Sequence, residues 1–301
     1  MKKFVALLLA VLMVASLCAC GQKDTQTGTH VFGVAMTVGK LTMSTNAQFP
    51  PYESVADDGK GYEGTGFEGI DIEIAYALAQ KLGLELVVDD MDFDSALSAV
   101  QTGKSDIVAA GVTVTPERQN TMSFTDSYAN GVQVVIVKEG SDIKSIDDLE
   151  GKQIGTQRGT TGYSYCIDDY GEDSVVPFDD GATAVQNLLA GKVDCVVIDK
   201  APAQEYVKAN AGLTILDTEY ANEDYAIGMA KDNTALQEAL NKALAELKAD
   251  GTPSSPSSTS IFPRSNRIQN ANHVKGGQLP PFARRKKEVS TWVIGRSFTP
   301  T

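Results

Sequence analysis

The chain has 301 residues, of which 42% are hydrophobic and 22% charged, and its net charge is −13. This composition suits a folded protein of one or two domains, and the acidic balance argues against nucleic acid as a partner. The two histidines, His30 and His273, lie near the ends of the chain. We therefore expect no histidine base or histidine metal ligand in the folded part, and no cofactor.

The first residues predict export. Two lysines precede an apolar run over residues 4–17, which is shorter than a membrane span requires. The run ends in the letters LCAC, which resemble the lipobox of bacterial lipoproteins. We expect a signal peptide at residues 1–19, a lipid such as palmitate on Cys20, and a tether over residues 20–39 that holds the protein to the outer side of a membrane. An ordinary secretory signal cut nearby is the alternative.

From Lys40 onward, short apolar strands alternate with amphipathic helices. One set of apolar residues recurs every four positions and predicts a helix face: Ile70, Ile74, Leu78 and Leu82. Gly83 would end this helix, and residues 84–88 would form a strand. The segment 92–111 repeats the step, with a strand at residues 107–110. This order predicts α/β layers with largely parallel sheets and a ligand at the carboxyl ends of the strands.

Two of the four cysteines fall in the folded part of the chain. Cys18 would leave with the signal peptide and Cys20 would carry the lipid, so Cys166 and Cys195 remain. Cys195 lies inside the predicted strand VDCVVID, where cysteine usually acts as a small buried hydrophobe. We expect both thiols to be buried and free, and a disulfide between them is the alternative.

Six segments carry a resemblance to a known family: STNAQFPPYES, GIDIEIAYALAQKL, DFDSALSAVQTGKSDIVAAGVTVTPERQNTMSFTDSY, IGTQRGTTGYSY, GKVDCVVID and YAIGMAKDNTALQEALNKALAELKADGT. In this order they resemble the family 3 extracellular solute-binding proteins, the amino-acid receptors of ABC importers, over about residues 40–252. The resemblance implies a two-lobed, periplasmic-binding-protein-like (type II) α/β fold with a two-segment hinge. Lobe one would hold 40–126 plus 225–252, lobe two 133–220, and the crossings 127–132 and 221–224.

The resemblance also implies a set of ligand-binding residues. Arg118 would hold the ligand's carboxylate, because its planar fork can donate two parallel hydrogen bonds, and Asp199 would receive the ligand's ammonium group. The other implied positions are Asn46, Phe49, Ile70, Ala110, Gly111, Thr113, Gln157, Thr160 and Thr161. Three simpler interpretations are open: Arg118 pairs with Glu117 at the surface, the threonines only cap a helix, and Asp199 caps the next one.

The implied function is capture of a free L-amino acid by a monomeric receptor, which hands the ligand to an ABC permease with a cytoplasmic ATPase. Relatives specific for arginine or lysine often place acidic groups near the ligand side chain, whereas Asn46 and Gln157 are neutral. This difference favours a polar uncharged or small apolar amino acid. A dehydratase-like enzyme on the same fold and a ligand-sensing domain of a signalling protein are the alternatives.

The end of the chain has a different composition. Residues 253–301 carry eight Lys/Arg against one Asp/Glu, a net +7, so residues 1–252 carry −20. Back-translation of residues 254–263, read one base earlier, can give V-Q-P-I-V-D-K-Y-I-S, which is similar to the last helix of the family. We therefore expect residues 253–301 to be out-of-frame translation, and a genuine basic tail that contacts anionic lipid is the alternative.

Overall fold

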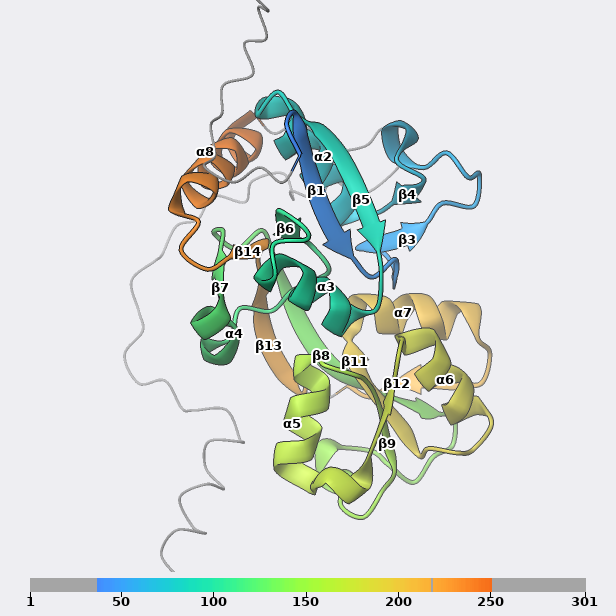
Figure 1. Ribbon diagram of the computed structural model, residues 1–301. Helices are drawn as coiled ribbons and strands as arrows, with labels where there is room; N and C mark the ends of the chain where they lie inside the picture. The colour runs from blue at the N-terminus through green and yellow to red at the C-terminus, as the bar shows by residue number, and fades with distance from the viewer. Residues whose placement is uncertain (1–36, 218, 251–301) are drawn as a thin grey trace, which may run out of the picture. The chain divides into compact units, whose positions relative to one another are not determined.

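The computed structural model describes residues 37–217 and 219–250. The expected signal peptide, the lipid site Cys20, most of the tether and the basic tail lie outside the described residues. Within them, the strands form a five-stranded sheet, a six-stranded sheet and a small three-stranded sheet, and helices pack against the two larger sheets (Figure 1).

The first lobe is built on the five-stranded sheet. Its strands lie in the order β5 (Glu85–Asp90), β1 (Lys40–Thr45), β6 (Ile107–Val108), β14 (Gly228–Ala230) and β7 (Met122–Phe124). The helices of this lobe are α2 (Ile70–Lys81), α3 (Phe93–Gln101), α4 (Pro116–Thr121) and α8 (Thr234–Asp250). The small sheet joins β2 (Gln48–Phe49), β3 (Glu53–Val55) and β4 (Phe67–Glu68), and the short helix η1 (Tyr62–Gly64) precedes β4.

The second lobe is built on the six-stranded sheet. Its order is β10 (Val175–Phe178), β9 (Ile154–Gln157), β11 (Cys195–Asp199), β8 (Ala129–Lys138) and β12 (Leu213–Ile215), and β13 (Ala221–Tyr225) also pairs with β8. The helices are α5 (Thr161–Tyr170), α6 (Gly181–Leu189) and α7 (Lys200–Ala209), with short turns η2 (Ile146–Leu149) and η3 (Glu172–Ser174).

The chain passes between the lobes twice, and the two passages make the sheets mixed rather than largely parallel. It leaves the first lobe between β7 and β8 and returns between β13 and β14. β8 and β13 pair antiparallel over five residues and lie side by side in Figure 1. β1 pairs parallel with β5 and β6, and β9 pairs parallel with β10 and β11, but β8 and β14 add antiparallel pairs. The expectation of largely parallel sheets was therefore wrong.

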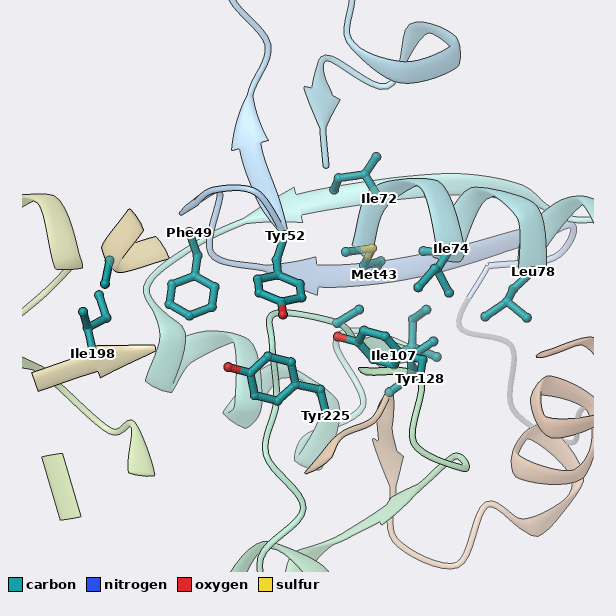
Figure 2. Packing of buried hydrophobic residues seen from close by; sticks show 14 of the residues in the cluster. Met43, Phe49, Tyr52, Ile72, Ile74, Leu78, Ile107, Tyr128, Ile198 and Tyr225 are labelled. Carbon is teal, nitrogen blue, oxygen red and sulfur yellow. The ribbon is translucent and has the colours of Figure 1, made fainter. Parts of the chain in front are cut away.

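Helix α2 buries a different face from the one that the four-residue spacing predicts. Its buried residues are Asp71, Ile72, Ile74, Ala75, Leu78 and Ala79, whereas Ile70 and Leu82 are only partly buried. The reason is geometric: an α-helix repeats every 3.6 residues, so a strict four-residue row drifts off the buried face. Figure 2 shows Ile74 and Leu78 beside Met43 of β1, and Phe49, Tyr52 and Tyr225 grouped further along the same cluster.

The two remaining cysteines are confirmed as buried, free thiols. Burial raises the pKa of Cys166 to about 12 and raises that of Cys195 as well. Among residues 37–217 and 219–250, no helix is both long and apolar enough to cross a membrane.

Candidate functional site

The segment after β6 positions an arginine at the carboxyl end of the first sheet. Gly111 turns the chain with a φ of 55° and donates its N–H to Asp71 Oδ2 at 2.8 Å. Thr115 then caps α4, because its hydroxyl accepts the N–H of Arg118 at 3.1 Å. Pro116 occupies the first turn of the helix, where no N–H is needed. The sequence thus places Arg118 in the first turn of α4, the helix that follows the buried strand β6.

The Arg118 guanidinium is held by backbone and by an aromatic ring. Nη1 donates to the Thr113 carbonyl at 2.9 Å, and Nη2 donates to the Gly159 carbonyl of the second lobe at 3.1 Å. The guanidinium carbon lies 5.4 Å from the centre of the Phe93 ring. Burial lowers the pKa of Arg118, and the nearby Glu223 opposes this shift. The interpretation of Arg118 as a surface residue paired with Glu117 therefore does not describe its contacts.

The second lobe presents the beginning of a helix to the same region. β9 ends at Gln157, and Thr160 caps α5 by accepting the N–H of Tyr163 at 3.2 Å. The Thr160 hydroxyl in turn donates to the Gln157 carbonyl at 2.8 Å. Thr161, the first residue of α5, is buried. Free N–H groups and the helix dipole make such a terminus favourable for a carboxylate, so the capping role of Thr160 is compatible with a ligand beside it.

Asp199 ends β11 and occupies the N-cap position of α7, but its side chain makes no capping hydrogen bond. The Tyr225 hydroxyl donates to Asp199 Oδ1 instead. Asp199 is 7% exposed. Burial raises its pKa well above the ordinary value, and the neighbouring Glu223 raises it further. A cation beside Asp199 would therefore stabilise its charged form.

Residues from these elements line one pocket. Its lining residues are Asn46, Phe49, Glu53, Phe93, Ala110, Gly111, Thr113, Arg118, Gln157, Thr160, Thr161 and Asp199. Ten of the eleven residues expected at the site line it. Ile70 does not, because its side chain packs against the large hydrophobic cluster that holds Ile72, Ile74 and Leu78.

Sequence reasoning missed two residues of the lining, Glu53 and Phe93. Phe93 fits an apolar helix face and gives no separate signal. Glu53 had a signal: it is an acidic residue between Tyr52 and Ser54 in a segment expected to form the pocket wall. In the structure Glu53 is completely buried, and Asp71 lies close enough to raise its pKa further than burial alone does.

Hydrogen bonds join the two lobes around the pocket. Gln157 Nε2 donates to Asn46 Oδ1 at 2.9 Å, and the Tyr206 hydroxyl donates to the Gln48 carbonyl at 2.7 Å. Together with the bond from Arg118 to Gly159, they hold the lobes against one another. The structure therefore has the lobes closed over the pocket.

The buried Glu223 connects one crossing segment to both lobes. It lies on β13 and accepts hydrogen bonds from Thr113 Oγ1 at 3.2 Å and from Gln133 Nε2 at 3.0 Å. Thr113 belongs to the first lobe and Gln133 to the second-lobe sheet. Nothing in the local sequence distinguishes Glu223 from the other acidic residues, which are abundant in this chain.

Comparisons with known proteins agree with this geometry. The model of the bacterial extracellular solute-binding proteins, family 3, matches residues 41–255. The chain belongs to this family. The ABC transporter arginine-binding protein 1 of Escherichia coli is 36% identical over 223 residues, which cover 72% of this chain and 89% of that protein. The L-cystine-binding protein TcyJ of Escherichia coli is 32% identical over 218 residues, with 71% and 79% covered.

A solved structure of an ancestral arginine-binding protein bound to glutamine is also similar to this chain. It is 41% identical with a TM-score of 0.67, and the match covers 72% of this chain and 95% of that one. The fold is thus the two-lobed type II fold of the family, and the protein is an amino-acid-binding receptor of the kind that ABC transporters use. The family is extracellular, and these relatives are binding proteins rather than enzymes.

Proposed function

We propose that this protein captures one free L-amino acid between its lobes, outside the cytoplasmic membrane, and delivers it to an ABC permease driven by a cytoplasmic ATPase. In this proposal the protein acts as a monomer, Cys20 carries the lipid that anchors it, and no covalent chemistry occurs. Residues 127–132 and 221–224 act as the hinge between lobe one (40–126 plus 225–252) and lobe two (133–220).

One observation carries the proposal: a single pocket is lined by Arg118 from the first lobe and by Asp199 from the second. An amino acid bears a carboxylate and an ammonium group on one carbon, so it needs an anion-binding and a cation-binding group at short range. Arg118 would take the carboxylate, helped by the N–H groups at the start of α5, and Asp199 would take the ammonium group. Only closed lobes bring both groups to the ligand.

The remaining lining residues would surround the ligand side chain. Asn46, Phe49, Glu53, Phe93 and Gln157 combine two aromatic rings with polar groups. The neutral Asn46 and Gln157 supported a polar uncharged or small apolar ligand, but the pocket also holds the acidic Glu53. The relatives named for arginine and cystine support a larger, polar ligand. We propose a polar amino acid, with the charge of its side chain decided by Glu53.

A thermal-shift panel tests the proposal. The full chain, purified in mild detergent, is melted alone and with each common amino acid. A ligand that binds only the folded protein stabilises it by about 2.7 kcal/mol at 100 times its Kd, so one or a few amino acids should raise the melting temperature. If no amino acid shifts a cooperative melt, the pocket does not serve this function.

A further inference from the structure

Binding of an α-amino acid depends on the separation between two groups of the pocket. The carboxylate and the ammonium group of such a ligand share one carbon. If the proposed function holds, Arg118 and Asp199 must therefore be held at one separation, within about 0.5 Å. The two residues belong to different lobes, since Arg118 lies on α4 and Asp199 ends β11. Some part of the fold must fix their separation when the lobes close.

The buried Glu223 is linked to Arg118 through one residue. The Thr113 carbonyl accepts a hydrogen bond from Arg118 Nη1 at 2.9 Å, and the Thr113 hydroxyl donates to Glu223 Oε2 at 3.2 Å. Thr113 also forms a β-bridge with Tyr225, so the end of β13 pairs with the segment that carries Thr113. Burial lowers the pKa of Arg118, and the charge of Glu223 opposes this shift. Arg118 is thus connected to β13 both by hydrogen bonds and by charge.

Glu223 is linked to Asp199 through one residue as well. Gln133 Nε2 donates to Glu223 Oε2 at 3.0 Å, and Gln133 is the residue of β8 that pairs with Asp199 of β11. Burial and the charge of Glu223 raise the pKa of Asp199, and a hydrogen bond from Gln133 opposes them. Tyr225, on the same face of β13 as Glu223, donates its hydroxyl to Asp199 Oδ1. Both links to Asp199 therefore start on β13.

A single atom of Glu223 joins the links to the two lobes. Oε2 accepts the hydroxyl of Thr113, from the first lobe, and the amide of Gln133, from the second-lobe sheet. Glu223 itself is 7% exposed and lies on the crossing strand β13. A buried acceptor with two fixed donors is costly to displace, because displacement leaves those donors without a partner. Glu223 can therefore hold the two sides of the pocket in register from outside the pocket lining.

We propose that Glu223 is a positioning residue that fixes the separation of Arg118 and Asp199 from the hinge, and that this separation makes the closed pocket select α-amino acids against their β-homologues. In a β-homologue, one extra methylene group separates the carboxylate from the carbon that bears the ammonium group. A pocket with a fixed separation then leaves one of the two charges unpaired, whereas a looser pocket adapts to either ligand. This inference rests on the roles proposed above for Arg118 and Asp199.

Titration calorimetry with L-arginine and L-glutamine, each compared with its β-homologue, tests the inference. The wild-type protein should bind each α-amino acid at least about 100-fold more tightly than its β-homologue, because the β-homologue leaves a buried charge unpaired. Glu223→Met keeps the length of the side chain but removes the acceptor. It should reduce the ratio of the two affinities to less than about 10-fold, mainly by weakening binding of the α-amino acid.

The conservative variant separates positioning from a merely structural role. Glu223→Gln keeps one oxygen that can accept both hydrogen bonds, so its ratio should stay near the wild-type value. If Glu223 only stabilised the fold, Glu223→Met would weaken both ligands by the same factor and leave the ratio unchanged. Asn222→Met, at an exposed position of the same strand, is the matched control and should leave the ratio unchanged.

A second variant breaks the same connection from the other side. Gln133→Met removes the amide that joins Glu223 to Asp199, and Gln133 does not line the pocket. This variant should also lower the ratio, and combining it with Glu223→Met should lower the ratio little further, because both changes remove one link. Thermal melts of each variant establish that it folds, and Gln133→Met carries the test if Glu223→Met does not fold.

The two proposals fail in different ways. If the wild-type protein binds an α-amino acid and its β-homologue equally, or if the ratio is unchanged in the variants that fold, the role of Glu223 is wrong while the amino-acid pocket stands. If neither the thermal-shift panel nor calorimetry detects any amino acid, the proposed function itself is wrong. If the panel identifies an amino acid other than arginine and glutamine, that amino acid and its β-homologue replace them.

Discussion

The two lobes contribute unequally to the pocket. The first lobe supplies eight of the twelve lining residues, including Phe49, Phe93 and both Arg118 and Glu53. The second lobe supplies four polar residues, Gln157, Thr160, Thr161 and Asp199. The first lobe thus offers enough surface to hold a ligand by itself, whereas the second offers groups that act only after closure. This difference predicts that first-lobe residues govern ligand capture and second-lobe residues govern retention.

The largest effect is expected at Arg118. Arg118→Ala leaves the ligand's carboxylate desolvated and unpaired, so affinity should fall by about 3–5 kcal/mol, or two to four powers of ten. If the first lobe captures the ligand, the association rate should fall as well as the residence time, which stopped-flow fluorescence measures. Arg158→Ala is the matched control, since Arg158 is a half-exposed arginine in an ion pair with Asp179. Unchanged binding in Arg118→Ala would show that the carboxylate lies elsewhere.

Asp199 should have the next largest effect, and it should act on retention. Asp199→Asn keeps an oxygen for the Tyr225 hydroxyl but removes the charge that pairs with the ligand's ammonium group. Affinity should fall by about 1.5–3 kcal/mol, the size of a charge-assisted hydrogen bond. The dissociation rate should rise while the association rate stays near its wild-type value. Asp142→Asn, at an exposed carboxylate of the second lobe, is the control. If Asp199→Asn slowed association and left the dissociation rate unchanged, the assignment of ligand retention to the second lobe would be wrong.

Gln157 provides a test of lobe closure that involves no charged side chain. Its side chain donates to Asn46 Oδ1 across the two lobes at 2.9 Å. Gln157→Ala leaves that buried oxygen without its donor, so the closed form should lose about 1–2 kcal/mol. Ligand affinity should fall by the corresponding factor, and small-angle scattering of the ligand-bound protein should reveal a larger open fraction. Gln153→Ala removes an exposed glutamine that lies just before β9, four residues before Gln157, and should change neither quantity.

The residues of the site were easier to predict from the sequence than the interactions that make each of them important. Arg118, Thr160 and Asp199 lie at ends of strands or starts of helices, and such positions follow from local patterns such as the caps at Thr115 and Thr160. Glu53 escaped notice because its importance lies in what surrounds it: Asp71, Asp199 and Asp90 come from distant parts of the chain and raise its pKa in addition to burial. Local sequence predicts a helix cap, but it does not predict which charged groups come together in the folded pocket.

The fold likewise has features that the sequence predicts and features that it does not. The alternation of helix and strand predicts the layers, since each element has its own period. The mixed sheets were not predictable, because the direction of β8 and β13 depends on where the chain crosses between lobes. The position of Ile70 likewise depends on the rotation of α2 about its axis, which a four-residue spacing determines only approximately.

The smallest expected effect comes from Gly159, at the contact between lobes. Its φ is 72°, and an added Cβ would lie 1.6 Å from Asp94 Oδ1 of the first lobe. The exposed Asp94 side chain can turn away at a cost of about 0.5–1.5 kcal/mol, so Gly159→Ala should weaken ligand binding by about 2–10-fold. Gly151→Ala is a close control, because Gly151 has a φ of 71° but nothing near its Cβ.

Both glycine variants should lose similar unfolding free energy in urea, since both force alanine into a left-handed conformation. Only Gly159→Ala should lose affinity, because only there does the new methyl group meet the opposite lobe. Adding Asp94→Ala should restore that affinity without restoring stability. If Gly151→Ala weakens binding equally, backbone strain rather than the contact between the lobes explains the loss, and Gly159 tells nothing about closure.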